Sequence, residues 1–357
     1  MDELELLRSV RSDVPEMTPD AFEQGRAALL VRAATGPGAT RRRPRRRAWR
    51  RAGWSAGGTL LGAGIATALV LTNTLGLAGW RGGADPAAAA SLHAAAAQTI
   101  KESDPFVAAG KFLKVSTTGI NNATATGDGA SEGYLVKSSD ELYVPADRTS
   151  DWIWHRTPAR PYKAFTTDAQ RVMEDIEAAE KRQNIDQAAE LLRAPGGRFY
   201  NSPAPVSEAD LQALPDNGYQ LLNYIYRVTL GKGSSPDAEA FTYIADLLRS
   251  GFVPAEQRAT LYDAAALIPG VTVVDKQATL DGRTGIALGH TNGKSIRQEI
   301  VIDPDTGLLI GEREIALDDS IPGLPAGTAI ESTAITTTVV DSAPTGGTPC
   351  GSTPCNQ

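Results

Sequence analysis

Residues 52–80 form a run of 29 residues without a charged side chain, in a chain of 357 residues. Because an α-helix rises about 1.5 Å per residue and a bilayer core is about 30 Å thick, roughly 20 apolar residues are enough to span a membrane. A helix that is apolar on every side has to be buried in protein or in lipid. The run therefore predicts a transmembrane helix over residues 54–79.

Eight arginines directly precede this run. They are Arg41, Arg42, Arg43, Arg45, Arg46, Arg47, Arg50 and Arg51. Only Arg81 follows closely on the other side, and basic residues next to a span stay in the cytoplasm. The cluster is thus a topology signal that places the N-terminus inside and the C-terminal part outside. A cleaved signal peptide is disfavoured, because its apolar stretch is only about 7–15 residues long.

The two sides of the predicted span differ in charge. Residues 1–81 carry 13 Lys and Arg and 7 Asp and Glu, so the rest of a chain of net charge −7 carries −13. An acidic outer part disfavours a nucleic-acid partner. The arginine cluster is interpreted as a contact with the bilayer headgroups rather than with nucleic acid.

The cytoplasmic segment, residues 1–53, has two short amphipathic helical patterns interrupted at Pro15. Two such helices cannot bury a core of their own, so they lie on a partner or stay partly unfolded. One hypothesis is a cytoplasmic sigma factor bound through residues 1–35, since anti-sigma domains use segments of this kind. The segment has no His or Cys, which excludes their zinc-dependent version. The alternative is a segment that only orients the chain.

Beyond the span, a helical linker is expected over residues 80–104, a folded domain over 105–342 and a flexible tail over 343–357. Strands are expected over residues 111–118, 132–138, 141–144 and 151–156, and helices over 167–193, 207–214, 217–230, 236–250 and 254–267. Asp281-Gly282, Asn292-Gly293 and residues 303–307 are hairpin turns between further strands, the last at residues 329–340. The fold class is α+β, with a curved antiparallel extracytoplasmic sheet and helices on one face.

Three motifs carry a resemblance to known proteins. They are the run from Pro254 through Pro269-Gly270-Val271, then Asp281-Gly282-Arg283-Thr284-Gly285, and Ile302-Asp303-Pro304-Asp305-Thr306-Gly307-Leu308-Leu309. With the arginine-rich segment, they resemble a family of uncharacterised actinobacterial single-pass membrane proteins, commonly encoded beside extracytoplasmic-function sigma factors. More distantly, the outer domain is similar to the half-barrels of LolA and RseB. That resemblance implies a concave face that holds acyl chains, and it assigns no ligand residue.

Ser131 lies in the pattern Gly129-Ala130-Ser131-Glu132-Gly133, which matches the G-x-S-x-G motif of hydrolases. That chemistry needs a strand before the serine and a helix after it, whereas here a loop precedes and a strand follows. The only downstream histidines, His155 and His290, are interpreted as structural. A hydrolase is therefore a distant third hypothesis, and the chain is predicted not to be an enzyme.

Asp303, Asp305 and Gly307 match the start of a calcium loop but lack its later ligands, so they are interpreted as a turn. Cys350 and Cys355 are the only cysteines. Outside the cytoplasm such a pair can close a small disulfide loop, and it offers too few ligands for zinc. No cofactor or metal is expected.

These features predict a cell-membrane protein with an extracytoplasmic binding or sensing domain. Its partners would be the bilayer, a lipid-like or protein ligand outside, and a sigma factor inside. The alternative is an envelope carrier or structural protein that binds a lipid-like ligand without signalling. A carrier predicts an apolar cavity between the sheet and the helices.

Overall fold

A computed structural model describes residues 83–102, 104–126, 131–183, 188–199 and 208–350 of the chain. The cytoplasmic segment 1–53, the predicted span 54–79 and the arginine cluster lie outside these residues. None of the helices within the described ranges is long and apolar enough to cross a membrane.

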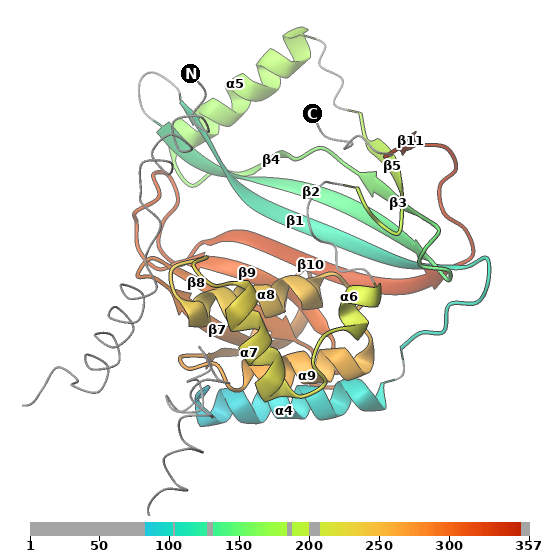
Figure 1. The fold of residues 1–357 in the computed structure, drawn as a ribbon. Helices are drawn as coiled ribbons and strands as arrows, with labels where there is room; N and C mark the ends of the chain where they lie inside the picture. Colours follow the sequence, from blue (N-terminus) through green and yellow to red (C-terminus); the bar gives the residue numbers. More distant parts are fainter. Residues whose placement is uncertain (1–82, 103, 127–130, 184–187, 200–207, 351–357) are drawn as a thin grey trace, which may run out of the picture. The chain divides into compact units, whose positions relative to one another are not determined.

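The described residues form an α+β fold (Figure 1). The helices are α4 (Pro86–Lys101), α5 (Thr167–Gln183), α6 (Glu208–Gln212), α7 (Gly218–Val228), α8 (Pro236–Arg249) and α9 (Ala255–Ala265). The strands are β1 (Phe112–Thr126), β2 (Ser131–Pro145), β3 (Asp151–Arg156), β4 (Arg160–Lys163), β5 (Glu190–Pro195), β6 (Thr272–Leu280), β7 (Arg283–Asn292), β8 (Ile296–Ile302), β9 (Leu309–Ala316), β10 (Ala329–Val340) and β11 (Thr348–Pro349).

All these strands belong to one curved sheet in the order β11-β5-β3-β2-β1-β10-β9-β8-β7-β6, with β4 on β2. Every pairing is antiparallel except that of β11 with β5. Strands β6 to β9 are consecutive hairpins, as the turn residues predict. The last strand of the meander, β10, pairs with β1, so the first strand and the meander are joined in the middle of the sheet. The expected α+β class with a curved antiparallel sheet is confirmed.

The N-terminal half of the sheet differs from the prediction at several strands. The strand expected at residues 111–118 is β1, which continues to Thr126 because it stays paired with β2, and β4 was not expected. The strands expected at 132–138 and 141–144 are one strand, β2, because pairing with β1 continues through Ser139 and Asp140. The helix expected over 167–193 ends at Gln183, and its last residues form β5 instead. Leu192 and Ala194 pair with the tryptophans of β3 and are buried. A short apolar run is compatible with a helix or a strand, and pairing with β3 makes β5 a strand.

Helices α4, α7, α8 and α9 pack together over the meander (Figure 1). Their apolar stripes meet Leu288, Ile300 and Ile302 of the sheet in the main core. Local signals explain the helix starts: Ser235 accepts a hydrogen bond from the Ala238 amide and caps α8. Asn217 caps α7 in the same way.

Two terminal regions take part in the fold. The helix expected as a linker, α4, packs along α9 and buries Ala88 and Leu92 in the core. Within the predicted tail, β11 pairs with β5, and the amide of Cys350 donates a 2.6 Å hydrogen bond to the carbonyl of Arg193. Cys355 lies outside the described residues, so its disulfide with Cys350 stays a prediction.

Candidate functional site

The site begins with a split in the sheet. Strand β10 pairs with β1 from Ser332 to Val340, but it pairs with β9 only as far as Ala334. Beyond that point β9 leaves, so within the described residues Ile335–Val340 have a neighbouring strand on one side only. An edge of this kind leaves room, and unpaired backbone groups, on its open side.

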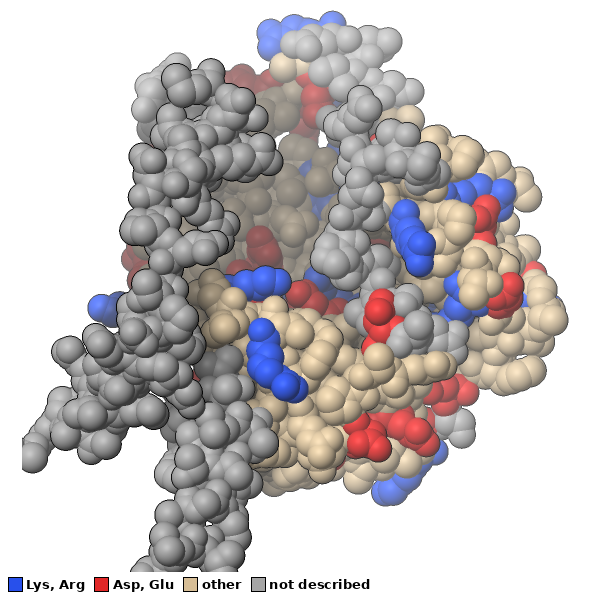
Figure 2. Space-filling view, viewed as in Figure 1, with Lys and Arg blue, Asp and Glu red and all other residues tan. Residues whose placement is uncertain are grey.

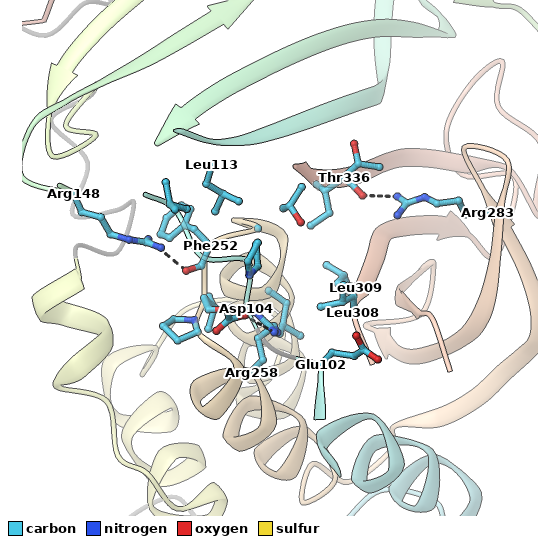
Figure 3. A pocket seen from close by; sticks show the side chains of 18 residues that line it. Glu102, Asp104, Leu113, Arg148, Phe252, Arg258, Arg283, Leu308, Leu309 and Thr336 are labelled. Atoms are coloured by element: carbon cyan, nitrogen blue, oxygen red, sulfur yellow. Dashed lines mark hydrogen bonds and ion pairs between the residues drawn. The ribbon is translucent and has the colours of Figure 1, made fainter. Parts of the chain in front are cut away.

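A cavity of about 300 Å³ lies at this split (Figure 3). Its walls come from β1, β9 and β10, from the connection between α8 and α9, and from the segment after α4. It is lined by Glu102, Asp104, Pro105, Val107, Leu113, Arg148, Leu248, Gly251, Phe252, Val253, Pro254, Arg258, Arg283, Leu308, Leu309, Ile335, Thr336 and Thr337. The wall is mainly apolar, with five charged side chains distributed around it.

The α8–α9 connection is held directly against the sheet by Gly251. Its φ of +73° belongs to the left-handed region, which glycine adopts without strain. A Cβ atom there would lie 2.8 Å from Val115 and 3.2 Å from Thr337. Only glycine therefore allows this close approach, which places Phe252 and Val253 in the cavity wall.

Phe252 is fixed by two neighbours on the β3 side. The ring of Trp152 meets it edge to face at 5.1 Å, and the guanidinium of Arg148 lies 5.6 Å from the ring centre. Arg148 also donates to the Phe252 carbonyl at 3.5 Å and receives the indole N–H of Trp152 on its own carbonyl at 3.0 Å. Such contacts make this wall a rigid apolar surface.

Residues 104–107 close another side of the cavity, and a hydrogen-bond cluster ties them to α9. Asp104 pairs with Arg258 at 2.8 Å and accepts the Ala255 amide at 2.7 Å. Arg258 in turn donates to Thr99 at 2.9 Å. A second cavity of about 320 Å³ shares five lining residues with the first and contacts Phe106, whose side chain is 86% exposed.

Arg283 lies on the opposite side of the cavity from Arg148 (Figure 3). It donates a 2.9 Å hydrogen bond to the carbonyl of Ile310 and another to that of Ile335, and so bridges the place where β9 leaves β10. Burial lowers the pKa of Arg283, while Asp281 and Asp303 oppose that change from a distance. The side chain is thus a partly desolvated cation in an apolar wall.

The residues of the hydrolase motif do not meet around Ser131. Ser131 opens β2 opposite Thr126, so a strand follows it. The Nδ1 atom of His155 lies 3.9 Å from Glu141, at the far end of the same strand. His290 is buried beside Phe241 under α8, where burial lowers its pKa. Within the described ranges, no group of acidic, His or Cys side chains is arranged to hold a metal ion.

Sequence reasoning did not identify the cavity residues. In the sequence, Gly251 only follows the helix expected over residues 236–250, and Arg283 is only part of the Asp281-Gly282-Arg283-Thr284-Gly285 motif. A signal was available at Arg283, because this arginine directly follows a hairpin turn and opens the strand that carries the apolar residues Ile286, Ala287 and Leu288. Its partners on β9 and β10 are distant in sequence, so no local pattern indicated them.

On the face shown in Figure 2, acidic and basic side chains are scattered among uncharged residues. No protein-family model matches the chain, and no curated protein is similar to it in sequence. Among solved structures it is similar to a DUF1329 family protein from Desulfovibrio piger, with 11% identity, 70% of this chain and 91% of that chain covered, and a TM-score of 0.18. A TM-score this low carries no argument about fold or function.

Proposed function

We propose that the chain is a single-pass membrane protein whose C-terminal domain lies outside the cytoplasm and binds a lipid-like ligand. The observation that carries this proposal is the apolar cavity at the split between β9 and β10. It lies between the sheet and the helices, where a carrier or lipid sensor needs its binding site.

The lining residues support an apolar ligand. Leu113, Val253, Leu309 and Ile335 line the cavity, and burying apolar surface against them is favourable by roughly 25 cal/mol per Å². Small-molecule pockets measure roughly 300–1,000 Å³, so a cavity of about 300 Å³ suits one narrow chain better than a bulky ring system. The second cavity extends the available path along residues 104–107.

The ligand-binding test uses the full-length chain held in an amphipathic polymer, so that no bilayer lipid competes. A fluorescent long-chain acyl probe is titrated, and native mass spectrometry identifies any lipid that copurifies. The informative variant is Thr337→Phe, because Thr337 lines the cavity and is half-buried. Displacing about two methylene groups of the probe costs roughly 1.6 kcal/mol, so binding should weaken by about tenfold or more.

Thr338→Phe is the matched control. Thr338 is the next residue of the same strand, is exposed and does not line the cavity. It should bind the probe as the unmodified chain does. No probe binding by the unmodified chain, or equal losses in both variants, would contradict the proposal.

Signalling and simple carriage differ in what residues 1–35 do. Full-length chain and a version without these residues are recovered from solubilised membranes, and their partners are identified by mass spectrometry. A sigma factor recovered only with the intact N-terminus would support a sensor that reports to transcription. Envelope components alone, unchanged by the deletion, would support the carrier.

A further inference from the structure

Arg283 differs from Arg258, another arginine of the cavity, in its partners. Arg258 is neutralised by Asp104. Both hydrogen-bond acceptors of Arg283 are neutral backbone carbonyls, and among the described residues no carboxylate forms an ion pair with it. The charge of Arg283 is therefore not balanced at close range.

The hydrogen bonds of Arg283 use only part of its donor set. Both involve Nη2, whereas a guanidinium carries five N–H donors on three nitrogens. Within the described part of the chain, Nε and Nη1 have no hydrogen-bond partner, and neither is sealed from solvent. Two donors fixed on the backbone hold the planar group in place while the others stay available.

A desolvated cation in an apolar wall is stabilised by an anion that enters the same cavity. A guanidinium matches the two oxygens of a carboxylate or a phosphate, and it forms shorter, stronger hydrogen bonds to them than to neutral groups. Leu309 and Ile335 line the same cavity as Arg283, so an apolar chain and an anionic end group can be satisfied together. Glu102 and Asp104 also line the cavity, but in Figure 3 Asp104 lies with Arg258 and Glu102 lies below Leu308, both away from Arg283.

We propose that Arg283 anchors the negatively charged end group of the ligand, which makes the ligand a single-chain amphiphile with a carboxylate or phosphate head. This inference rests on the proposed function, because it assumes that the cavity holds an apolar chain. It adds the charge of the ligand and the residue that recognises it.

The test compares three probes of equal chain length: a long-chain fatty acid, its methyl ester and the corresponding lysophosphatidic acid. Each displaces the fluorescent acyl probe from the full-length chain. A hydrogen bond to a charged group contributes about 1.5–3 kcal/mol, so an anionic probe should bind about tenfold or more tightly than the ester. Whether the acid or the phosphate binds better identifies the head group.

Arg283→Gln should abolish the preference for the anionic probes over the methyl ester. It should leave ester binding within about twofold of the unmodified chain, because glutamine can still donate to the two carbonyls. Arg283→Lys keeps the positive charge but lacks the planar set of guanidinium donors, so it should retain part of the preference for the anionic probes. Circular dichroism confirms that each variant is folded.

The outcomes separate the two proposals. Equal binding of ester and anions by the unmodified chain overturns the anchor while the acyl cavity stands. The anchor is also overturned if Arg283→Gln weakens binding of the ester as much as binding of the anions, since Arg283 would then only support the cavity wall. If no probe binds the unmodified chain, the cavity proposal itself fails. If Arg283→Gln does not fold, binding of the three probes to the unmodified chain and to Arg283→Lys still tests whether Arg283 anchors the anionic group.

Discussion

Arg283 and Arg313 belong to the same meander, and both are partly buried, yet they meet different partners. The Nε atom of Arg313 lies 2.7 Å from Glu299, whose side chain is fully buried and also pairs with Arg297 at 2.7 Å. Arg283 meets two backbone carbonyls and a cavity. A buried ion pair has its charges satisfied within the fold, whereas a buried charge without a counter-ion is available to a ligand.

The largest effect is expected where the ion pair is broken. Glu299→Gln leaves Arg297 and Arg313 side by side without the carboxylate that separates them. Removing one partner of a buried charge cluster costs about 3 kcal/mol or more. The free energy of unfolding, measured by urea denaturation at neutral pH, should fall by that amount.

Glu331→Gln is the control for this change, because Glu331 is an exposed acid on β10 of the same sheet. Its effect should stay within about 0.5 kcal/mol. Equal effects of the two variants would mean that the Glu299 cluster is not a buried ion pair in solution, and the contrast with Arg283 would lose its basis.

A third arginine, Arg249, extends the comparison to an ion pair that titrates. Its Nε atom lies 2.6 Å from Glu312, although not at a hydrogen-bonding angle. Burial raises the pKa of Glu312 from 4.5 to about 7 in spite of Arg249. The folded state therefore binds this proton more tightly than the unfolded state does, and stability is lost as the pH rises from 4.5 to 7.

Glu312→Gln should remove this loss. Relative to the unmodified chain, the variant should gain on the order of 2 kcal/mol of unfolding free energy between acid and neutral pH. Urea denaturation across that pH range measures the difference. Parallel curves for the two chains would mean that the pKa of Glu312 is the same in the folded and the unfolded state.

The smallest effect on stability is expected from a change at Asp104, which forms an ion pair with Arg258 in the cavity wall. Its carboxylate is 41% exposed, so solvent weakens the pair and Asp104→Asn should cost only about 0.5 kcal/mol of stability. The same change leaves a second arginine in the cavity without a carboxylate, so the fatty-acid probe should bind more tightly while its ester does not. Unchanged fatty-acid binding would show that positive charge in this cavity does not select the ligand.

The C-terminal meander was the most predictable part of the fold. Its turns carry Asp281-Gly282 and Asn292-Gly293, and its strands end within two residues of those turns. Hairpins are local, so short-range sequence signals determine them. The strand expected at residues 329–340 is β10 as observed.

Predictions failed where a distant partner decided the local structure. β5 forms a strand because it pairs with β3, which carries Trp152 and Trp154, although the residues of β5 also suit a helix. The candidate site depends on such contacts throughout: Gly251 approaches Val115 and Thr337, which are far from it in the chain.

The sequence by itself predicted a membrane span, its orientation, the α+β class and the hairpins, because charge runs, apolar length and turn residues act over short distances. The span and orientation stay predictions, since they concern residues outside those described. Only the tertiary structure decided where the sheet splits and that, among the described residues, Arg283 has no carboxylate partner. Both depend on strands and side chains brought together from distant parts of the chain, and no local pattern records which of them will meet.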